Sequence, residues 1–262
     1  MKLAFMTHRG SVRPENQDAL QIAGGVRTGD MALPAVLEMD DLRAPLLLSV
    51  VDGLGGHRGG ARAAEILVRA LAAGADRFGA VLDPQTDARL LRELLAGGAR
   101  GMREEALRDS ALSDMGATIA GLLIRERSAL AFNCGDSRAY RFSRGEGEKL
   151  EGEKLTHDHS AVQELLDRGE ITEEEMRSHP RKNIVTSAVT ADAFDDFELF
   201  VKPVSRAHGD AFFLCSDGVW EALSMSRLTH FLNDPAPDAP KRFFDSLIAA
   251  ECRDNVSFIQ VR

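Results

Sequence analysis

The sequence has little of what disulfide-rich, zinc-binding or membrane-spanning proteins need. Only three of its 262 residues are cysteines, Cys134, Cys215 and Cys252, and no C-x-x-C pair occurs. An odd cysteine count without that spacing argues against a disulfide framework and against a zinc site. No apolar stretch approaches the roughly 18 residues that a membrane helix requires. We therefore expect the cysteines to be buried as small hydrophobic residues in a reducing compartment.

Positive charge is also scarce. The chain has 32 Lys and Arg residues against 41 Asp and Glu residues, and its formal net charge is -9. An acidic surface argues against binding to nucleic acid or to anionic membranes. The N-terminal segment "MKLAFMTHRGSVRPENQD" lacks the long apolar region of a signal peptide. These features predict a cytoplasmic protein that binds neither nucleic acid nor membranes, and a monomer is the default expectation.

Short apolar runs bounded by turn residues predict buried strands. They lie at 44–53, 117–124, 128–136, 137–142, 210–218 and 255–262. Periodic apolar positions predict helices at 61–73, 86–107, 226–232 and 240–250. Helices come in pairs and strands come in adjacent runs, without the strict alternation of a parallel sheet. This pattern favours an α+β layered domain.

A polar section at 160–181 interrupts the strand pattern. It indicates two short helices, the second with Thr172 as its N-cap and Glu175 completing a capping box. We interpret the section as a surface subdomain or a flap. Three nearby histidines are expected to be surface or capping residues, although histidine also binds metals. They are His157, His159 and His179.

Aspartates recur at the margins of the predicted strands. Five of them lie there: Asp18, Asp52, Asp136, Asp217 and Asp254. One Asp-Gly pair is an ordinary turn signal, but several carboxylates gathered at one end of a sheet would repel one another and rise in pKa. No lysine cluster accompanies them, so a bound divalent cation is the simplest neutraliser. Oxygen ligands without a His/Cys set indicate Mg²⁺ or Mn²⁺, and so many carboxylates suit two ions.

The glycine-rich loop after Asp52 does not match a nucleotide-binding pattern. Five glycines lie between Gly53 and Gly60, but no Lys-Ser/Thr pair completes a P-loop. Arg58 stands where the dinucleotide fingerprint has its last glycine. We interpret the loop as bare backbone that keeps the floor of a metal site clear, so that a glycine carbonyl and water can approach the ions.

Seven short segments together resemble the type 2C, metal-dependent serine/threonine protein phosphatases in their bacterial form. In order they are "RPENQD" (13–18), "VVDGLGGH" (50–57), "GATIAGLLI" (116–124), "NCGDSRAYRF" (133–142), "LTHDHS" (155–160), "FLCSDG" (213–218) and "RDNVSFI" (253–259). The resemblance implies an α-β-β-α sandwich, that is, two antiparallel sheets flanked by helix pairs. It also implies that residues 1–262 form a single catalytic domain with a flap at about 160–190.

The same resemblance implies a two-metal centre. Asp52 would bridge two Mn²⁺ or Mg²⁺ ions, and the carbonyl of Gly53 would bind one of them. Asp217 and Asp254 would hold the other ion. Asp18 would lie beside them and act through a metal-bound water.

Three more residues take roles by resemblance. Asp136 matches the ligand of a third, weaker ion. Arg13 matches the arginine that grips the substrate phosphate while a hydroxide bridging the two ions attacks phosphorus. His57 is a candidate general acid, and a structural role at the start of a helix is the alternative. The segment "TSAVT" (186–190) departs from the family's pattern after the flap but contains no metal ligand.

The implied function is hydrolysis of phosphoserine and phosphothreonine in proteins, opposing a bacterial Ser/Thr kinase. One alternative is an inactive relative that binds phosphoproteins as a regulator. The presence of Arg13 together with all five aspartates favours an active enzyme over that alternative. A second alternative is a hydrolase of small phosphate esters, which the sequence does not distinguish from a protein phosphatase.

Overall fold

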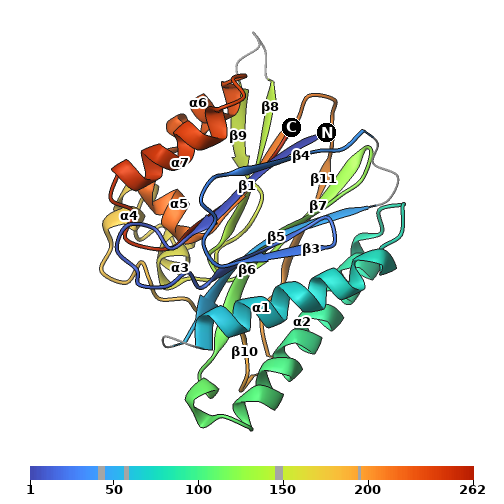
Figure 1. Ribbon diagram of the computed structural model, residues 1–262, viewed down its shortest axis with the longest axis vertical. Coiled ribbons are helices and arrows are strands. Elements are labelled where there is room, and N and C mark those ends of the chain that lie inside the picture. Colours follow the sequence, from blue (N-terminus) through green and yellow to red (C-terminus); the bar gives the residue numbers. More distant parts are fainter. Residues whose placement is uncertain (41–44, 56–58, 145–149, 194–195) are drawn as a thin grey trace.

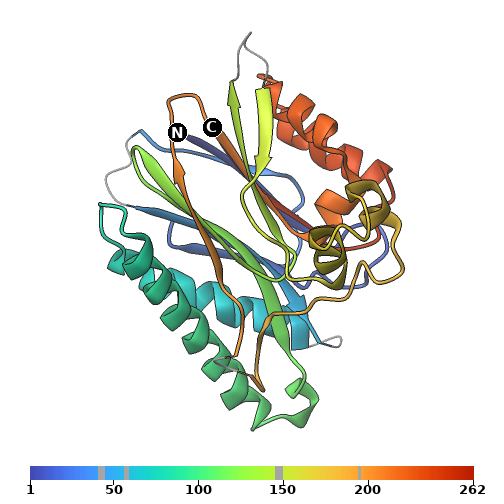
Figure 2. The ribbon, with the colours of Figure 1, turned by 180° about the vertical axis from the view of Figure 1, so that it is seen from behind.

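The computed structural model describes residues 1–40, 45–55, 59–144, 150–193 and 196–262. Two antiparallel sheets are stacked face to face, and helices cover the outer face of each (Figures 1 and 2). This arrangement confirms the predicted α+β class and the α-β-β-α sandwich.

Two sheets form the centre of the described part of the chain. Sheet A contains, in spatial order, β4 (Ala35–Glu38), β1 (Lys2–His8), β13 (Val256–Val261), β12 (Ala211–Cys215), β8 (Arg138–Arg144) and β9 (Leu150–Lys154). Sheet B contains β11 (Phe200–Ser205), β7 (Ser128–Cys134), β6 (Gly116–Ile124), β5 (Leu46–Leu54), β2 (Asp18–Ile22) and β3 (Gly25–Thr28). The short strand β10 (Val189–Thr190) pairs with the start of β6.

Helices cover both outer faces. On sheet B lie α1 (Gly59–Gly74) and α2 (Pro84–Ala106). On sheet A lie α5 (Asp217–Ala222), α6 (Met225–Asn233) and α7 (Ala239–Ala249). Short 3-10 turns occur at Ala75–Arg77 and Ser110–Leu112. The four helices predicted from periodicity correspond to α1, α2, α6 and α7, with ends that differ by one or two residues.

The central strands are apolar along their whole length because both of their faces are covered. Successive side chains of a strand point to opposite faces. In β5, Leu46, Leu48 and Val50 pack between the two sheets. Leu47 and Val51 of the same strand pack against α1 and α2. Continuous apolar runs such as "LLLSVV" therefore predict these strands correctly, although they show no alternation.

Several strands are absent from the prediction; β3, β4, β9, β10 and β11 are short or lie at an edge, whereas β1 and β2 are inner strands. β1 contains an apolar stretch too short to predict a strand by itself, and it is held between β13 and β4. β9 reads "LEGEK" and pairs only with β8. β11 contains Pro203, which is tolerated because β11 is an edge strand of sheet B.

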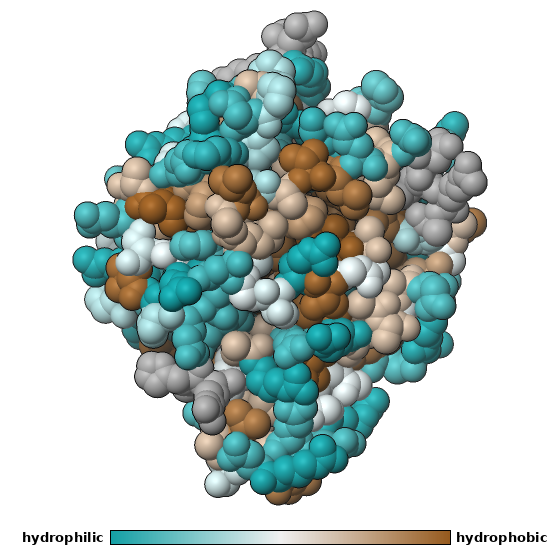
Figure 3. Space-filling view, viewed as in Figure 1, coloured by the Kyte–Doolittle hydropathy of each residue, from teal (hydrophilic) through white to brown (hydrophobic). Residues whose placement is uncertain are grey.

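Figure 3 shows a surface that is mostly hydrophilic over the helices, with hydrophobic residues across the upper middle, where Figure 1 places β4. Leu33, Val36 and Leu37, in and beside this strand, are among the exposed large hydrophobic residues. In the described ranges we find no helix that combines the length and the hydrophobicity of a membrane span.

Candidate metal centre

The five predicted aspartates lie at one end of the sandwich. Asp52 is near the end of β5, and Asp18 stands directly opposite it at the start of β2. Asp217 is the first residue of α5, immediately after β12. Asp136 follows β7, and Asp254 precedes β13. Residues from distant parts of the chain thus meet at this end of the two sheets.

A cavity of about 390 Å³ opens at this end of the sheets. Its lining includes Arg13, Gln17, Asp52, Gly53, Leu54, Gly55, Asp136, Asn183, Val185, Asp217, Asp254 and Asn255. Six of the seven predicted site residues that the structure describes therefore share one cavity. The seventh, Asp18, does not line it. His57 lies outside the described residues.

Asp18 is buried beside Asp52. The hydroxyl of Ser216 donates a hydrogen bond of 2.8 Å to Oδ2 of Asp18. Oδ1 of Asp18 is buried and has no hydrogen-bond partner among the described residues. Burial raises the pKa of Asp18 to about 6, with a further contribution from the charge of Asp254. A buried carboxylate oxygen without a partner can accept a hydrogen bond from a water or bind a cation.

Burial and mutual repulsion raise the pKa values of the other carboxylates. Burial is the main cause for Asp52 and Asp217, and the neighbouring aspartates add to it. Burial raises the pKa of Asp136 to about 7, with help from the charge of Asp158. The ionised cluster is therefore unfavourable as it stands, and a bound cation would stabilise it.

The donor set fits hard divalent cations. The predicted side-chain ligands are all carboxylates, the ligand type that Mg²⁺ and Mn²⁺ prefer. In the described part of the chain, no group of three or more His, Cys, Asp or Glu side chains is already arranged around one point. Mg²⁺ usually keeps several waters and takes one or two carboxylates, so a ready-made protein cage is not required.

Arg13 stands at the mouth of the cavity and pairs with Asp254. Its Nη2 lies 2.5 Å from Oδ2 of Asp254. The bond to Asp254 raises the pKa of Arg13, so the guanidinium is permanently charged. The side chain is about half exposed. A cation bound by Asp254 would compete with Arg13 for the same carboxylate.

The family model for protein phosphatase 2C matches residues 35–250. The chain belongs to the protein phosphatase 2C family. The prediction of family and enzyme class from the seven segments is thereby confirmed.

Two curated relatives resemble this member of the family over most of their lengths. Serine/threonine phosphatase Stp of Listeria monocytogenes is 31% identical over 232 residues, which are 88% of this chain and 83% of the relative. Protein phosphatase PhpP of Streptococcus pneumoniae is 33% identical over 249 residues, which are 92% of this chain and 88% of the relative.

Solved structures show the same fold. Serine/threonine phosphatase Stp1 from Staphylococcus aureus superimposes with a TM-score of 0.80 at 25% identity, covering 98% of this chain and 93% of that chain. The catalytic domain of PstP, solved in complex with two manganese ions, gives a TM-score of 0.75 at 24% identity, covering 99% and 98%.

Glycines in this protein phosphatase 2C chain allow backbones to touch around the cavity. A Cβ atom on Gly53 would lie 2.1 Å from the carbonyl oxygen of Gly60, at the start of α1. A Cβ atom on Gly218 would lie 2.1 Å from the carbonyl oxygen of Asn255. Gly53 therefore has a packing role besides the one predicted for the glycine loop. It lets α1 pack against β5, as Gly218 lets α5 pack against the start of β13.

Asn255 is a site residue that the sequence analysis missed. Its Nδ2 donates to the carbonyl oxygens of Arg9 and Glu15, and its Oδ1 accepts from the amide of Gln17. These bonds tie the loop that carries Arg13 to the start of β13. The only sequence signal is an amide residue directly after the predicted ligand Asp254.

The flap contributes to the cavity wall. Its helices are α3 (Ala161–Asp167) and α4 (Glu173–Ser178), and the predicted capping box of Thr172 and Glu175 is present. The segment after α4 returns to the core, where Asn183 and Val185 line the cavity. At the end of the segment 186–190, Val189 and Thr190 form β10, which pairs with the start of β6.

His159 differs from the prediction, since it is buried and lies next to the Asp136 turn. Its Nδ1 accepts a 3.0 Å hydrogen bond from the amide of Gly135, and its own amide donates to the Gly135 carbonyl. His157 is half exposed beside Asp167, and His179 caps α4, as expected. The expectation for His159 was wrong because its burial depends on a turn 24 residues away.

Proposed function

We propose that this protein phosphatase 2C member hydrolyses phosphoserine and phosphothreonine in proteins with two Mn²⁺ or Mg²⁺ ions bound at the carboxylate cavity. The observation that carries the proposal is the convergence of four aspartates and one arginine on a single cavity of about 390 Å³. The two manganese ions of the PstP complex belong to that protein, and the proposal extends such a pair to this chain.

The ligand assignment extends the roles that the family resemblance implies to the residues of this cavity. Asp52 and the Gly53 carbonyl would hold one ion, and Asp52 would bridge to a second held by Asp217 and Asp254. Asp18, behind Asp52, would act through water. When bound, the ions would supply activation of the attacking water and neutralisation of charge on the phosphoryl group. Asp136, at the cavity edge, would hold a third and weaker ion.

Arg13 supplies the group that recognises phosphate. A guanidinium makes paired, charge-assisted hydrogen bonds to phosphoryl oxygens. Arg13 is exposed at the cavity mouth and only one carboxylate oxygen holds it in the described residues. It can therefore orient the phosphoryl group without leaving the site, which is the positioning that phosphoryl transfer needs.

The cysteines do not offer an alternative nucleophile. All three are buried. Burial raises the thiol pKa of Cys134 to about 12 and that of Cys252 to about 11, and it also raises the pKa of Cys215. A thiolate is the reactive form, so none of these residues supports a covalent cysteine mechanism at neutral pH.

The proposal also includes the domain organisation of the chain and the enzyme that would oppose it. Residues 1–262 would act as one catalytic domain, with 160–190 as a flap over substrate access. The phosphoproteins must be made by a Ser/Thr kinase, which would be the opposing enzyme. Cytoplasmic location and a monomeric state stay predictions.

The full chain with Mn²⁺ should hydrolyse a phosphothreonine peptide, and EDTA should abolish the reaction. Asp52→Asn and Asp217→Asn should each lower kcat/KM roughly 100-fold or more, because each removes charge that holds the ions. Asp76→Asn, at an exposed site far from the cavity, is the matched control and should equal the wild type.

Three outcomes would contradict the proposal in different ways. Full activity in EDTA would exclude the metal mechanism. Binding of the phosphopeptide without hydrolysis would favour the non-catalytic regulator. Hydrolysis of small phosphate esters but of no phosphopeptide would favour the small-ester hydrolase.

A further inference from the structure

The turn that carries Asp136 is held from two sides. On one side, the amide and carbonyl of Gly135 are both bonded to His159, and Nδ2 of Asn133 also donates to the Gly135 carbonyl at 3.0 Å. These bonds fix the residue before Asp136. They hold the peptide group that joins Gly135 to Asp136, but not the Asp136 carbonyl.

On the other side, Trp220 holds Asp136 directly. The indole Nε1 of Trp220 donates a 3.0 Å hydrogen bond to the backbone carbonyl of Asp136. Trp220 is buried, with 5% of its surface exposed. It belongs to α5, the helix that begins at the predicted ligand Asp217. The helix α5 therefore carries the predicted ligand Asp217 and also holds the backbone of the predicted ligand Asp136.

The indole is itself fixed by a buried charge pair. The guanidinium carbon of Arg138 lies 3.5 Å from the ring centroid of Trp220. Arg138 donates two hydrogen bonds, of 2.8 and 2.5 Å, to Oδ2 of Asp158, whose side chain is fully buried. Lys154 adds a contact of 3.3 Å to the other oxygen of Asp158. The ion pair holds the guanidinium against the ring face, and this contact opposes a rotation of the indole away from Asp136.

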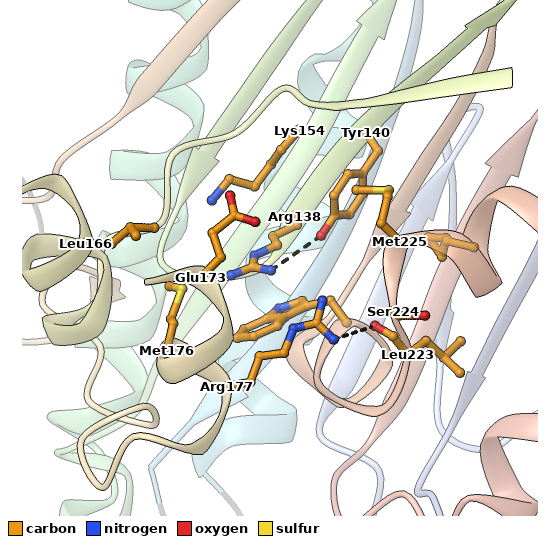
Figure 4. A pocket seen from close by; sticks show the side chains of 12 residues that line it. Arg138, Tyr140, Lys154, Leu166, Glu173, Met176, Arg177, Leu223, Ser224 and Met225 are labelled. Carbon is orange, nitrogen blue, oxygen red and sulfur yellow. Dashed lines mark hydrogen bonds between the residues drawn. The ribbon is translucent and has the colours of Figure 1, made fainter. Parts of the chain in front are cut away.

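The stacked side chains of Arg138 and Trp220 also lie close to the predicted flap. Both residues line a second cavity of about 120 Å³, between the flap and α5–α6. Figure 4 shows Arg138 and Tyr140 on the core side of this cavity, with Glu173, Met176 and Arg177 of α4 facing them. Arg177 donates to the carbonyl of Leu223, just after α5. The flap therefore packs on the elements that hold the Asp136 turn.

We propose that Trp220 is a positioning residue that fixes the Asp136 carbonyl, so that the Asp136 carboxylate faces the cavity and can bind the third, weaker cation. This inference rests on the proposed function. It assigns a role to a side chain that touches neither substrate nor metal. A merely structural Trp220 would affect folding without changing the affinity of one cation site in particular.

Trp220→Phe is the direct test, because it keeps an aromatic ring under Arg138 and removes the N–H donor, although it also removes part of the buried ring system. Binding of Mn²⁺ to the full chain is measured by calorimetry and by electron paramagnetic resonance of the free ion. We expect the weakest site to bind about three- to ten-fold less tightly, the change expected for one lost hydrogen bond. The two tighter sites should stay within twofold of the wild type.

Two further variants serve as a positive and a negative control for this measurement. Asp136→Asn should lose the same weak site. Tyr140→Phe removes the hydroxyl that lies 3.5 Å from Arg138 in the same aromatic cluster, without touching the Asp136 turn, and it should bind Mn²⁺ like the wild type. Trp220 is the single tryptophan of the chain, so its fluorescence gives an independent signal. Paramagnetic Mn²⁺ should quench it in the wild type, with the weak-site step missing in Asp136→Asn.

Other results would overturn the inference. An unchanged weak site in a folded Trp220→Phe protein would show that the hydrogen bond does not matter. Equal weakening of all sites together with a lower melting temperature would show a structural role only. A wild type that binds two ions but no third would remove this inference and leave the proposed function standing. A wild type that binds no Mn²⁺ would contradict both.

Discussion

Asp18 and Asp52 face each other across two antiparallel strands. Like charges in that position destabilise a sheet. The burial that raises the pKa of Asp18 to about 6 adds to the cost of ionising both residues. A structural role would be served as well by an uncharged pair. The pair therefore supports the proposed metal centre, because a bound cation would offset the cost of the two charges.

At the scale of single residues, a substitution of Arg13 tests its proposed role in binding phosphate. We expect Arg13→Ala to lower kcat/KM on a phosphothreonine peptide about 10- to 100-fold, since charge-assisted hydrogen bonds to phosphate are lost. Mn²⁺ affinity should be equal to or higher than that of the wild type, because Asp254 loses its competing guanidinium. Steady-state kinetics and calorimetric titration measure the two quantities separately.

Arg253→Ala is the matched control, because it removes an exposed positive charge next to Asp254 and should change neither quantity much. If Arg13→Ala weakened Mn²⁺ binding and left peptide kinetics intact, Arg13 would be a structural residue and not the phosphate-binding one.

At the scale of secondary-structure elements, the site depends on close contacts between backbones. Gly53 touches the first turn of α1, and Gly218 touches the segment before β13. Asn255 ties the Arg13 loop to the same segment. The Gly218 contact brings the helix that begins at Asp217 against the segment that carries Asp254, while the other two contacts fix β5 against α1 and the Arg13 loop against Asn255. The spacing of the aspartates therefore depends on backbone packing as well as on the aspartates themselves.

Gly53→Ala tests this dependence. The new methyl group would collide with the backbone of Gly60, which cannot swing aside as a side chain could. We expect a loss of about 1–3 kcal/mol or more in the free energy of unfolding, together with weaker Mn²⁺ binding. Thermal or denaturant unfolding measures the first effect, and calorimetry measures the second.

Gly79→Ala is the matched control, because nothing lies within 4 Å of the methyl group it would add. It should be neutral or slightly stabilising, since alanine restricts the unfolded chain more than glycine does. Equal stability of the two variants would mean that the close approach of β5 and α1 can relax at little cost.

At the scale of the whole molecule, the sandwich brings carboxylates from distant parts of the chain together at one end, where they are largely shielded from water. The fold therefore carries an electrostatic cost in the absence of metal. Two of the raised pKa values, about 6 for Asp18 and about 7 for Asp136, lie well above the usual value of 3.8. These shifts make the stability of the metal-free protein depend on pH.

Between pH of about 4 and about 7, the folded protein holds protons on Asp18 and Asp136 that the unfolded chain releases. Because the folded state binds more protons, the free energy of unfolding falls as pH rises through this window. We expect the protein in EDTA to melt at a lower temperature at pH 8 than at pH 5. Calorimetric or circular dichroism melts over this range measure the effect.

Added Mn²⁺ should reduce or reverse this dependence, because a bound cation favours the ionised carboxylates. Asp136→Asn should also make the EDTA profile flatter, while Asp76→Asn should leave it unchanged. A metal-free protein that becomes more stable from pH 5 to pH 8 would contradict the raised pKa values.

The sequence by itself determined the α+β class, the helices α1, α2, α6 and α7, and the aspartates at the strand margins, while the sandwich followed from the family resemblance. These features are local: apolar runs, helical periodicity, and an aspartate at the end of a strand can each be read from a few neighbouring residues. Seven such segments in order were enough to indicate the family. The edge strands and β1 could not be predicted in this way, because their stability comes from partners distant in sequence.

Only the tertiary structure decided which residues support the aspartates. Asn255 bonds to Arg9 and Glu15 across more than 230 positions of the chain, and Trp220 bonds to Asp136 across 84. The burial of His159 and the contact between Gly53 and Gly60 also arise where separate segments pack together. Hydrogen bonds and steric contacts act over a few ångströms, so they depend on which segments the fold brings together. The order of residues along the chain does not reveal which distant segments will be neighbours.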